Sequence, residues 1–257
     1  MARLDALRPK GFGFSGRTAI VAVSNRPGAG VRRLPVMVEM TPDRWQFTRR
    51  YGDEVFGQQD EHLAGVMDEA VAAGLPDIAV DAQIGRFLMI QTSMTRARLA
   101  VEVGTLAGYS GIWIARGLAP GGRLITIESD PRHADFAQRQ FERAGVSDRV
   151  EIRRGSALEV LPQLSRELGA RSVDVVFIDA EKTEYPQYWD AVEPMIAVGG
   201  VVLADNVFGS NLWWIDNPDD PASRAADTFN RSIAGHPDFE AVAVPLRQGI
   251  LIGRRMK

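Results

Sequence analysis

Apolar and polar positions follow two different periods along the chain, and the period changes near residue 98. Before that point apolar residues recur at helical spacing. Thr41-Pro42 is typical of a helix start, because a capping hydroxyl precedes a proline at the first helical position. We therefore expect helices over residues 42–51, over residues 60–73 with Gly74 closing the second, and from Asp81 to about Met94.

After residue 98, short apolar runs rich in β-branched residues alternate with helical segments. The expected strands cover residues 99–103, 123–127, 150–153, 173–178 and 201–204, and the expected helices cover 109–118, 131–144, 156–168 and 184–197. Such alternation predicts βαβ units and a parallel sheet with helices on both faces. Residues 240–244 and 249–253 are joined by too short a segment for a crossover helix, which predicts an antiparallel hairpin.

Composition narrows the chemistry that the chain can perform. Its 257 residues suffice for one large α/β domain, and no apolar run reaches the roughly 18 residues of a membrane span. The absence of cysteine excludes disulfides, thiolate metal sites and cysteine nucleophiles, and it suits a cytoplasmic enzyme. The three histidines lie far apart, so a metal ion would need oxygen ligands.

Charge is distributed unevenly along the chain. Residues 1–36 carry a net charge of +6, which leaves −9 for the rest of a chain whose total is −3. An acidic body is unsuited to nucleic-acid phosphates and favours a small-molecule substrate. We expect residues 1–36 to be a flexible extension, with a transit peptide or sequence upstream of a start at Met37 or Met40 as alternatives. One domain would follow over residues 37–257, helical over 41–95 and with its sheet core over 98–257.

Four acidic residues follow apolar runs that are typical of buried strands: Glu102, Glu128, Asp179 and Asp205. Because the carboxyl ends of parallel strands share one edge of a sheet, we expect these carboxylates to converge where such folds bind ligands. Each acid alone is explained equally well as a cap of the following helix. Together they would raise one another's pKa and cost stability unless a cation or a polyol ligand joined them.

The first strand–helix turn is rich in glycine, which lets a ligand approach the backbone closely. Glu128 lies 24 residues beyond Gly104, where an acid that binds a ribose hydroxyl is expected. Glu102, directly before the turn, would repel a pyrophosphate but attract a sulfonium and an ammonium group. The turn therefore favours S-adenosylmethionine over a nicotinamide dinucleotide. An oxidoreductase of similar fold and a non-enzymatic cofactor-binding protein are the alternatives.

Five segments give this interpretation a family. The segment VEVGTLAGYS at residues 101–110 resembles the cofactor motif of the cation-dependent O-methyltransferases, which include catechol and caffeoyl-coenzyme A O-methyltransferases. The similarity continues through ITIESD at 125–130, GSALE at 155–159, FIDAEK at 177–182 and LADNV at 203–207, and it covers about residues 60–257. It implies a Rossmann-like class I methyltransferase, a seven-stranded sheet in the order 3-2-1-4-5-7-6, and a homodimer.

The resemblance also assigns roles to individual residues. Those that would contact S-adenosylmethionine are Val80, Glu102, Gly104, Thr105, Ser110, Glu128, Ser129, Ser156, Ala157 and Asp179. Among these, the residues of the glycine turn would hold the methionine part, Glu128 the ribose, and Ser156 and Ala157 the adenine. Asp179, Asp205 and Asn206 match the metal ligands. Lys182 matches the lysine that takes the acceptor proton, and with Asp179 it makes up the catalytic set.

Two carboxylates and an amide carbonyl are hard oxygen donors. They suit Mg²⁺ first, and also Mn²⁺ or Ca²⁺, rather than zinc. A nearby cation and partial burial would lower the pKa of Lys182 and suit it to accept a proton. The expected reaction is metal-assisted methyl transfer to a hydroxyl of a small phenolic acceptor, such as a catechol or a hydroxycinnamate. Taken alone, Asp205-Asn206 is more often a plain turn, and Lys182 more often an exposed loop residue; the pairing with Asp179 and the family resemblance favour the metal site and the base.

Three departures from the family's pattern leave the acceptor open. Glu181 stands where aspartate is common, residues 207–213 read VFGSNLW, and Gln248-Gly249 replaces a frequent Asp-Gly in the last hairpin. Trp213 and Trp214 fall in a long segment over 208–221. They would either wall a flat acceptor or pack at a subunit contact.

Overall fold

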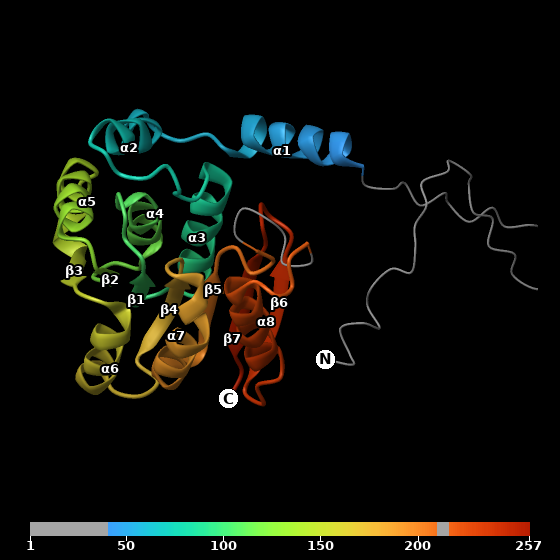
Figure 1. Cartoon of the computed structure of the whole chain (residues 1–257). Helices are drawn as coiled ribbons and strands as arrows, with labels where there is room; N and C mark the ends of the chain where they lie inside the picture. Colours follow the sequence, from blue (N-terminus) through green and yellow to red (C-terminus); the bar gives the residue numbers. More distant parts are fainter. Residues whose placement is uncertain (1–40, 210–215) are drawn as a thin grey trace, which may run out of the picture. The chain divides into compact units, whose positions relative to one another are not determined.

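The fold was obtained as a computed structural model, which describes residues 41–209 and 216–257. The apolar runs of the described residues form seven strands of a single sheet, in the order β3-β2-β1-β4-β5-β7-β6 (Figure 1). The strands are β1 (Leu99–Val103), β2 (Arg123–Glu128), β3 (Val150–Arg154), β4 (Val173–Ile178), β5 (Ile196–Ala204), β6 (Phe239–Val244) and β7 (Ile250–Arg255). The first five pair in parallel, and β7 runs antiparallel to both β5 and β6. This confirms the expected order and the terminal hairpin.

Helices cover both faces of the sheet (Figure 1). They are α2 (Glu61–Ala72), α3 (Ala82–Met94), α4 (Tyr109–Gly117), α5 (Pro131–Arg143), α6 (Ala157–Leu168), α7 (Tyr185–Val192) and α8 (Pro221–Ala234), with short 3-10 helices at Ser147–Arg149, Lys182–Glu184 and Glu193–Met195. Helix α1 (Pro42–Phe56) precedes them, and none of its described side chains belongs to either apolar core. One apolar core lies between the sheet and α2–α5, and a second lies between the sheet and α6–α8. The sheet is therefore buried on both faces, as its unbroken apolar strands predicted.

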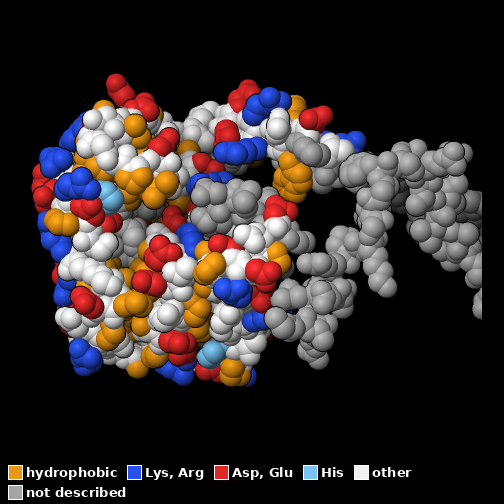
Figure 2. All heavy atoms as spheres, in the orientation of Figure 1, with side chains coloured by type: hydrophobic (Ala, Val, Ile, Leu, Met, Phe, Trp, Pro, Cys, Tyr) orange, Lys and Arg blue, Asp and Glu red, His pale blue; other side chains and the backbone are white. Residues whose placement is uncertain are grey.

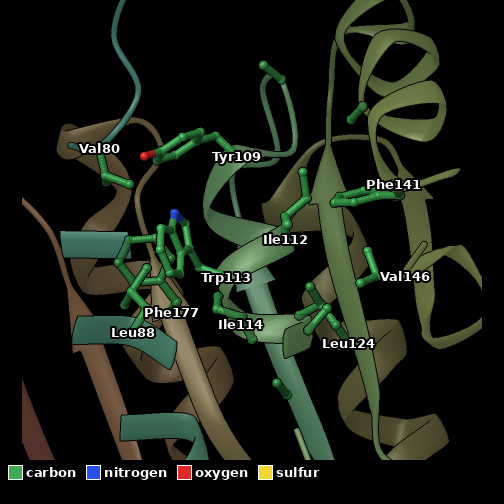
Figure 3. Close-up of a cluster of buried hydrophobic side chains, with 14 of the residues drawn as sticks. Val80, Leu88, Tyr109, Ile112, Trp113, Ile114, Leu124, Phe141, Val146 and Phe177 are labelled. Carbon is green, nitrogen blue, oxygen red and sulfur yellow. The ribbon is translucent and has the colours of Figure 1, made fainter. Parts of the chain in front are cut away.

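Close packing between α3 and α4 fixes the position of α4 on the first face. Trp113 of α4 is 4% exposed and lies against α3 and Phe177 of β4 (Figure 3). A Cβ atom added to Gly85 of α3 would come within 2.3 Å of the Trp113 indole, so only glycine fits there. Because α4 begins at the end of the glycine turn, this contact also holds that turn in place.

Aspartates begin several of the helices. Asp60, Asp81, Asp130 and Asp220 each accept a backbone N–H from the first turn of the helix that follows. A cap of this kind stabilises a helix by about 0.5–2 kcal/mol. None of these four is one of the strand-end acids Glu102, Glu128, Asp179 and Asp205, so helix capping does not explain that second set.

Two expectations about helices were wrong. The helix expected over 184–197 ends at Val192, and β5 already begins at Ile196. Pro194 lies between them in a 3-10 turn, because proline lacks the N–H that would continue the helix. Helix α8 was not expected at all. Asp220-Pro221 begins it with the same cap-and-proline signal that correctly identified the start of α1.

Several expectations concern residues that the structure does not describe. The extension over 1–36 and the two adjacent tryptophans, Trp213 and Trp214, lie outside the described residues. Among the described residues, no helix is both long and apolar enough to cross a membrane. On the face shown in Figure 2, acidic and basic side chains of the described residues are interspersed with apolar ones.

Candidate active site

The glycine turn between β1 and α4 lies against the end of β4. Gly104 has a φ of 101°, and an added Cβ would stand 2.1 Å from the carbonyl oxygen of Asp179. Gly108, with a φ of 82°, begins α4. Both positions need the left-handed backbone that glycine adopts without strain. The first strand and the strand that carries Asp179 therefore meet in backbone contact at this edge of the sheet.

Glu102 is completely buried behind this turn. Its two carboxylate oxygens accept hydrogen bonds from Ser110 Oγ at 2.6 Å and from Thr126 Oγ1 at 2.7 Å. Burial raises the pKa of Glu102 to about 7, and the charges of Asp179 and Glu128 add to the effect. Glu102 does not line the open pocket. Its carboxylate instead orients the hydroxyl of Ser110, which does.

Glu128 lies at the end of β2 and joins the two sides of the crevice. Its oxygens accept the backbone N–H groups of Leu106 at 2.8 Å and Asp130 at 2.9 Å. Leu106 belongs to the glycine turn and has a positive φ of 47°. The carboxylate is thus held in place by two backbone donors from opposite sides, at the position where an acid could accept ribose hydroxyls.

The start of α6 and the segment before α3 also line the crevice. Ser156 precedes α6, but its hydroxyl makes no capping bond to that helix, which leaves it available to a ligand. Ala157, Val80 and Ser129 line the same pocket. His133 of α5 also lines it, with its ring 3.7 Å from the Glu128 carboxylate.

Asp179 and Asp205 follow the neighbouring parallel strands β4 and β5. The Asp179 N–H donates to Val103 at 2.9 Å, and the Asp205 N–H donates to Ile178 at 3.1 Å, so the sheet ladder continues to both acids. Asp205 is only 1% exposed. Its pKa is raised to about 7, first by burial and then by the charge of Asp179. The two carboxylates are therefore close enough to repel each other.

Asn206 completes this group of oxygen donors. It has a left-handed φ of 58°, a conformation that asparagine tolerates better than most residues, and its N–H donates to Asp205 Oδ1 at 2.9 Å. Its side-chain amide donates to Gln248 Oε1 at 3.2 Å. The tight turn thus bonds Asn206 both to Asp205 and to the hairpin residue Gln248.

Lys182 lies in the loop after β4 and points back to the end of that strand. Its Nζ donates to Asp179 Oδ1 at 2.7 Å and to the Tyr185 hydroxyl at 2.5 Å. Tyr185 is fully buried, and its hydroxyl lies 3.1 Å from the carbonyl oxygen of Asp205, to which it can donate. Tyr185 thus links the lysine to both acid-bearing strands. Lys182 itself is largely buried, so it is not an exposed loop residue.

The pKa of Lys182 moves in the direction opposite to our expectation. Burial alone lowers it, but the Asp179 carboxylate and the Tyr185 hydroxyl more than offset that effect, and the net pKa is raised. The expected lowering depended on a neighbouring cation. With Asp179 as its partner, the lysine is held as an ammonium ion.

The three oxygen-bearing side chains fit a hard divalent cation. The described residues hold no cluster of three or more His, Asp or Glu side chains suited to a metal, but the set here has only two carboxylates, and an amide completes it. Asp205 Oδ2 has no hydrogen-bond donor among the described residues; its nearest counter-charge is Arg247, at 3.8 Å. A buried carboxylate with a raised pKa and an open oxygen is what bound Mg²⁺ or Mn²⁺ would stabilise.

A single pocket of about 700 Å³ unites these groups, within the range of roughly 300–1,000 Å³ for small-molecule sites. The expected site residues that line it are Val80, Gly104, Thr105, Ser110, Glu128, Ser129, Ser156, Ala157, Asp179, Lys182 and Asn206. Glu102 and Asp205 lie buried behind its wall. The expected convergence of the four strand-end acids is confirmed, because Glu128 and Asp179 line this one pocket and the charge of Asp179 helps to raise the pKa values of the buried Glu102 and Asp205.

Sequence reasoning missed part of the pocket lining. His133, Tyr188, Arg247 and Gln248 line it, although none was assigned to the site. For the hairpin turn the sequence did contain a signal. Gln248 replaces the aspartate that is frequent in the family, and it accepts a hydrogen bond from the Asn206 side chain. Nothing in the local sequence distinguishes His133 or Tyr188 from other helical residues.

Comparisons with known proteins agree with this geometry. Residues 53–256 match the O-methyltransferase family. A catechol O-methyltransferase of Niastella koreensis is 37% identical over 196 residues, which is 76% of this chain and 88% of that protein. A catechol O-methyltransferase of Mycobacterium tuberculosis is 38% identical over 193 residues, covering 75% of this chain and 85% of that one. The crystal structure of a Bacillus cereus O-methyltransferase in complex with SAH superposes with a TM-score of 0.74 at 34% identity, over 83% of this chain and 99% of that one.

Proposed function

Because this chain belongs to the O-methyltransferase family, we propose that it transfers the methyl group of S-adenosylmethionine to a hydroxyl of a small aromatic acceptor. One observation carries the proposal. The glycine turn and Glu128 line the same pocket as Asp179, Asn206 and Lys182, with Asp205 buried behind Asn206. The methyl donor would take the end beside Glu128, and the acceptor would take the end beside Lys182. A nucleoside cofactor at the first end would present its reactive group to an acceptor at the second.

The cofactor end suits S-adenosylmethionine in three respects. The glycine turn lines the pocket, so a ligand can lie directly beside its backbone. The Glu128 carboxylate is held ready for ribose hydroxyls, and Ser110 presents a hydroxyl that the buried Glu102 orients. The SAH in the Bacillus cereus structure supports the same assignment. The family assignment also excludes the nicotinamide-dependent oxidoreductase that the sequence left open.

At the acceptor end, Asp179, Asp205 and Asn206 would hold a divalent cation. When bound, that cation would stabilise negative charge on the acceptor oxygen and draw the Asp179 charge away from Lys182. Lys182 is the only ammonium group among the described residues that line the pocket. Its Nζ is positioned by Asp179 and Tyr185, so it is suited to take the acceptor proton at a fixed point.

A screen of acceptors tests the proposal. We expect purified protein to transfer label from methyl-labelled S-adenosylmethionine to ortho-diphenols, and much less to monophenols or aliphatic alcohols, because two adjacent oxygens fix the acceptor better than one. Mass spectrometry of the products would locate the methyl group on oxygen. Protein that binds the cofactor but labels no acceptor in the panel would instead support a non-enzymatic cofactor-binding protein.

We also propose that the chain forms a homodimer through α1. Phe47 and Tyr51 stack on one face of helix α1 and are 64% and 53% exposed. Exposed aromatic clusters of this kind commonly mark protein interfaces. A second copy of the chain would cover them, in agreement with the family resemblance.

Light scattering checks this oligomeric state. The wild-type protein should have about twice the 28.2 kDa mass of the chain at micromolar concentration. A Phe47→Glu/Tyr51→Glu variant should be monomeric, because it buries two charges in the interface. Met94→Glu, at a residue 74% exposed on α3, is the matched control and should stay dimeric. A monomeric wild type would refute the proposal.

A further inference from the structure

Arg247 lies in the turn between β6 and β7 and lines the pocket beside Asn206 and Gln248. The N–H of Val207 donates to Gly249 at 3.1 Å, and that of Phe208 donates to Gln248 at 2.9 Å. The hairpin turn is thus bound to the chain that directly follows Asp205 and Asn206. Any side chain at position 247 is held beside the proposed acceptor site.

The backbone at this turn is tightly constrained. Gly249 has a φ of 90°, and an added Cβ would lie 2.4 Å from the Phe208 ring, so the turn cannot shift toward that ring. Arg247 has a left-handed φ of 46°, which is unfavourable for a residue with a Cβ atom. Strain of this kind persists where the surroundings enforce it, and it is common at functional sites.

The guanidinium of Arg247 is only partly used within the protein. Its Nη1 donates to the carbonyl oxygen of Ala79 at 3.2 Å and lies 3.8 Å from Asp205 Oδ2, too far for a hydrogen bond. Its Nε and Nη2 have no partner among the described residues. The side chain is 25% exposed in the pocket wall. A planar group with unused parallel donors is suited to bind a carboxylate in a bidentate manner.

We infer that Arg247 is an acceptor-binding residue that pairs with a carboxylate on the aromatic acceptor. The preferred substrates are then ortho-dihydroxy aromatic acids rather than neutral catechols or catecholamines. The inference rests on the proposed function, since it assumes that the acceptor lies between Lys182 and Arg247. A single carboxylate fits better than a dianion, because Asp179 and Glu184 line the same region and would repel additional negative charge.

Matched acceptors test this role. 3,4-Dihydroxybenzoate and 3,4-dihydroxybenzamide have the same shape and differ in charge. For the wild type, kcat/KM should be about 10–100-fold higher for the acid, the range expected for a charge-assisted hydrogen bond. Arg247→Gln should reduce that ratio to about one, and Arg247→Lys should keep part of it, because lysine retains the charge but not the bidentate geometry. Arg254→Gln, at an exposed position on β7, is the control and should keep the wild-type ratio.

Equilibrium binding gives a second readout that does not depend on turnover. Calorimetric titration of both compounds into protein saturated with S-adenosylhomocysteine should show tighter binding of the acid to the wild type and equal binding to Arg247→Gln. Equal kcat/KM or equal affinity for the two compounds in the wild type would overturn the inference. It would also be overturned if Arg247→Gln lowered both acceptors by the same factor, since Arg247 would then serve only Asp205 or the Ala79 segment. If neither compound is methylated, the proposed function fails, and the binding measurement still decides the role of Arg247.

Discussion

Replacing Asp205 with alanine should lower kcat/KM for methyl transfer by at least about 10²-fold, because a bound Lewis acid supplies several kcal/mol and each 1.4 kcal/mol is a factor of ten. Asp205 is buried, and its Oδ2 has no hydrogen-bond donor among the described residues. This oxygen is therefore the atom that we expect to bind the cation. The affinity for S-adenosylhomocysteine should be unchanged, since Asp205 does not line the crevice beside Glu128. Labelled turnover and calorimetry measure the two effects separately.

Asp205→Asn separates a loss of function from a loss of folding. The asparagine carbonyl can still accept the Asn206 N–H that Asp205 Oδ1 accepts at 2.9 Å, while the charge that burial disfavours is removed. This variant should therefore be at least as stable as the wild type to heat and yet as inactive as Asp205→Ala. Chelation by EDTA should lower the wild type to the same level, and Mg²⁺ or Mn²⁺ should restore only the wild type. Full activity in metal-free protein would show that Asp179, Asp205 and Asn206 serve another purpose.

Lys182→Ala should lower kcat by roughly 10²–10⁴-fold, the range for loss of a general base, with a smaller effect on KM. The loss should diminish at high pH, where an ionised phenol needs no base. Lys182 Nζ is held at the pocket wall by hydrogen bonds to Asp179 and Tyr185. Without this amine, no other lysine among the described pocket residues can take the proton from the substrate hydroxyl. Pre-steady-state measurements across a pH series would follow the transfer step itself.

Lys182→Arg tests whether the residue acts as a base or only as a counter-ion. Arginine keeps the positive charge beside Asp179 but cannot release its proton in this pH range. A base role requires that Lys182→Arg be nearly as inactive as Lys182→Ala. Wild-type activity in Lys182→Arg would mean that the charge alone matters, and the proton would then leave by another route.

The strands and the meeting of the strand-end acids could be predicted from local sequence patterns, whereas the strand order and the roles of single residues came from the family resemblance. Apolar runs that end in an acid marked β1, β2, β4 and β5, and a parallel sheet must place those ends on one edge. That rule places Asp179 and Asp205, which directly follow β4 and β5, and Lys182 lies only three residues beyond Asp179. Their roles as ligands and base are proposals that the variants above address.

What sequence reasoning missed depends on contacts between distant parts of the chain. The direction of the Lys182 pKa is set by its hydrogen bond to Asp179, which a sequence pattern does not contain. Arg247 reaches the pocket only because β7 lies beside β5, and its donation to Ala79 joins residues 168 positions apart. Helix α8 is a different case, because its signal at Asp220-Pro221 was present in the sequence but was not applied.

The two ends of the pocket are built by parts of the fold that differ in how well they tolerate amino-acid substitution. The methyl donor would bind at turns between parallel strands, where Gly104 and the Asp179 backbone leave no space for an added atom. Arg247 instead belongs to a short loop that joins β6, at the edge of the sheet, to β7. Its backbone is fixed at Gly249, but side chains on such a connection can be exchanged more freely than those at turns between parallel strands. Substrate range can therefore diverge between relatives, or be redesigned, through this loop without disturbing donor binding, so that homologues of equal overall similarity need not share an acceptor.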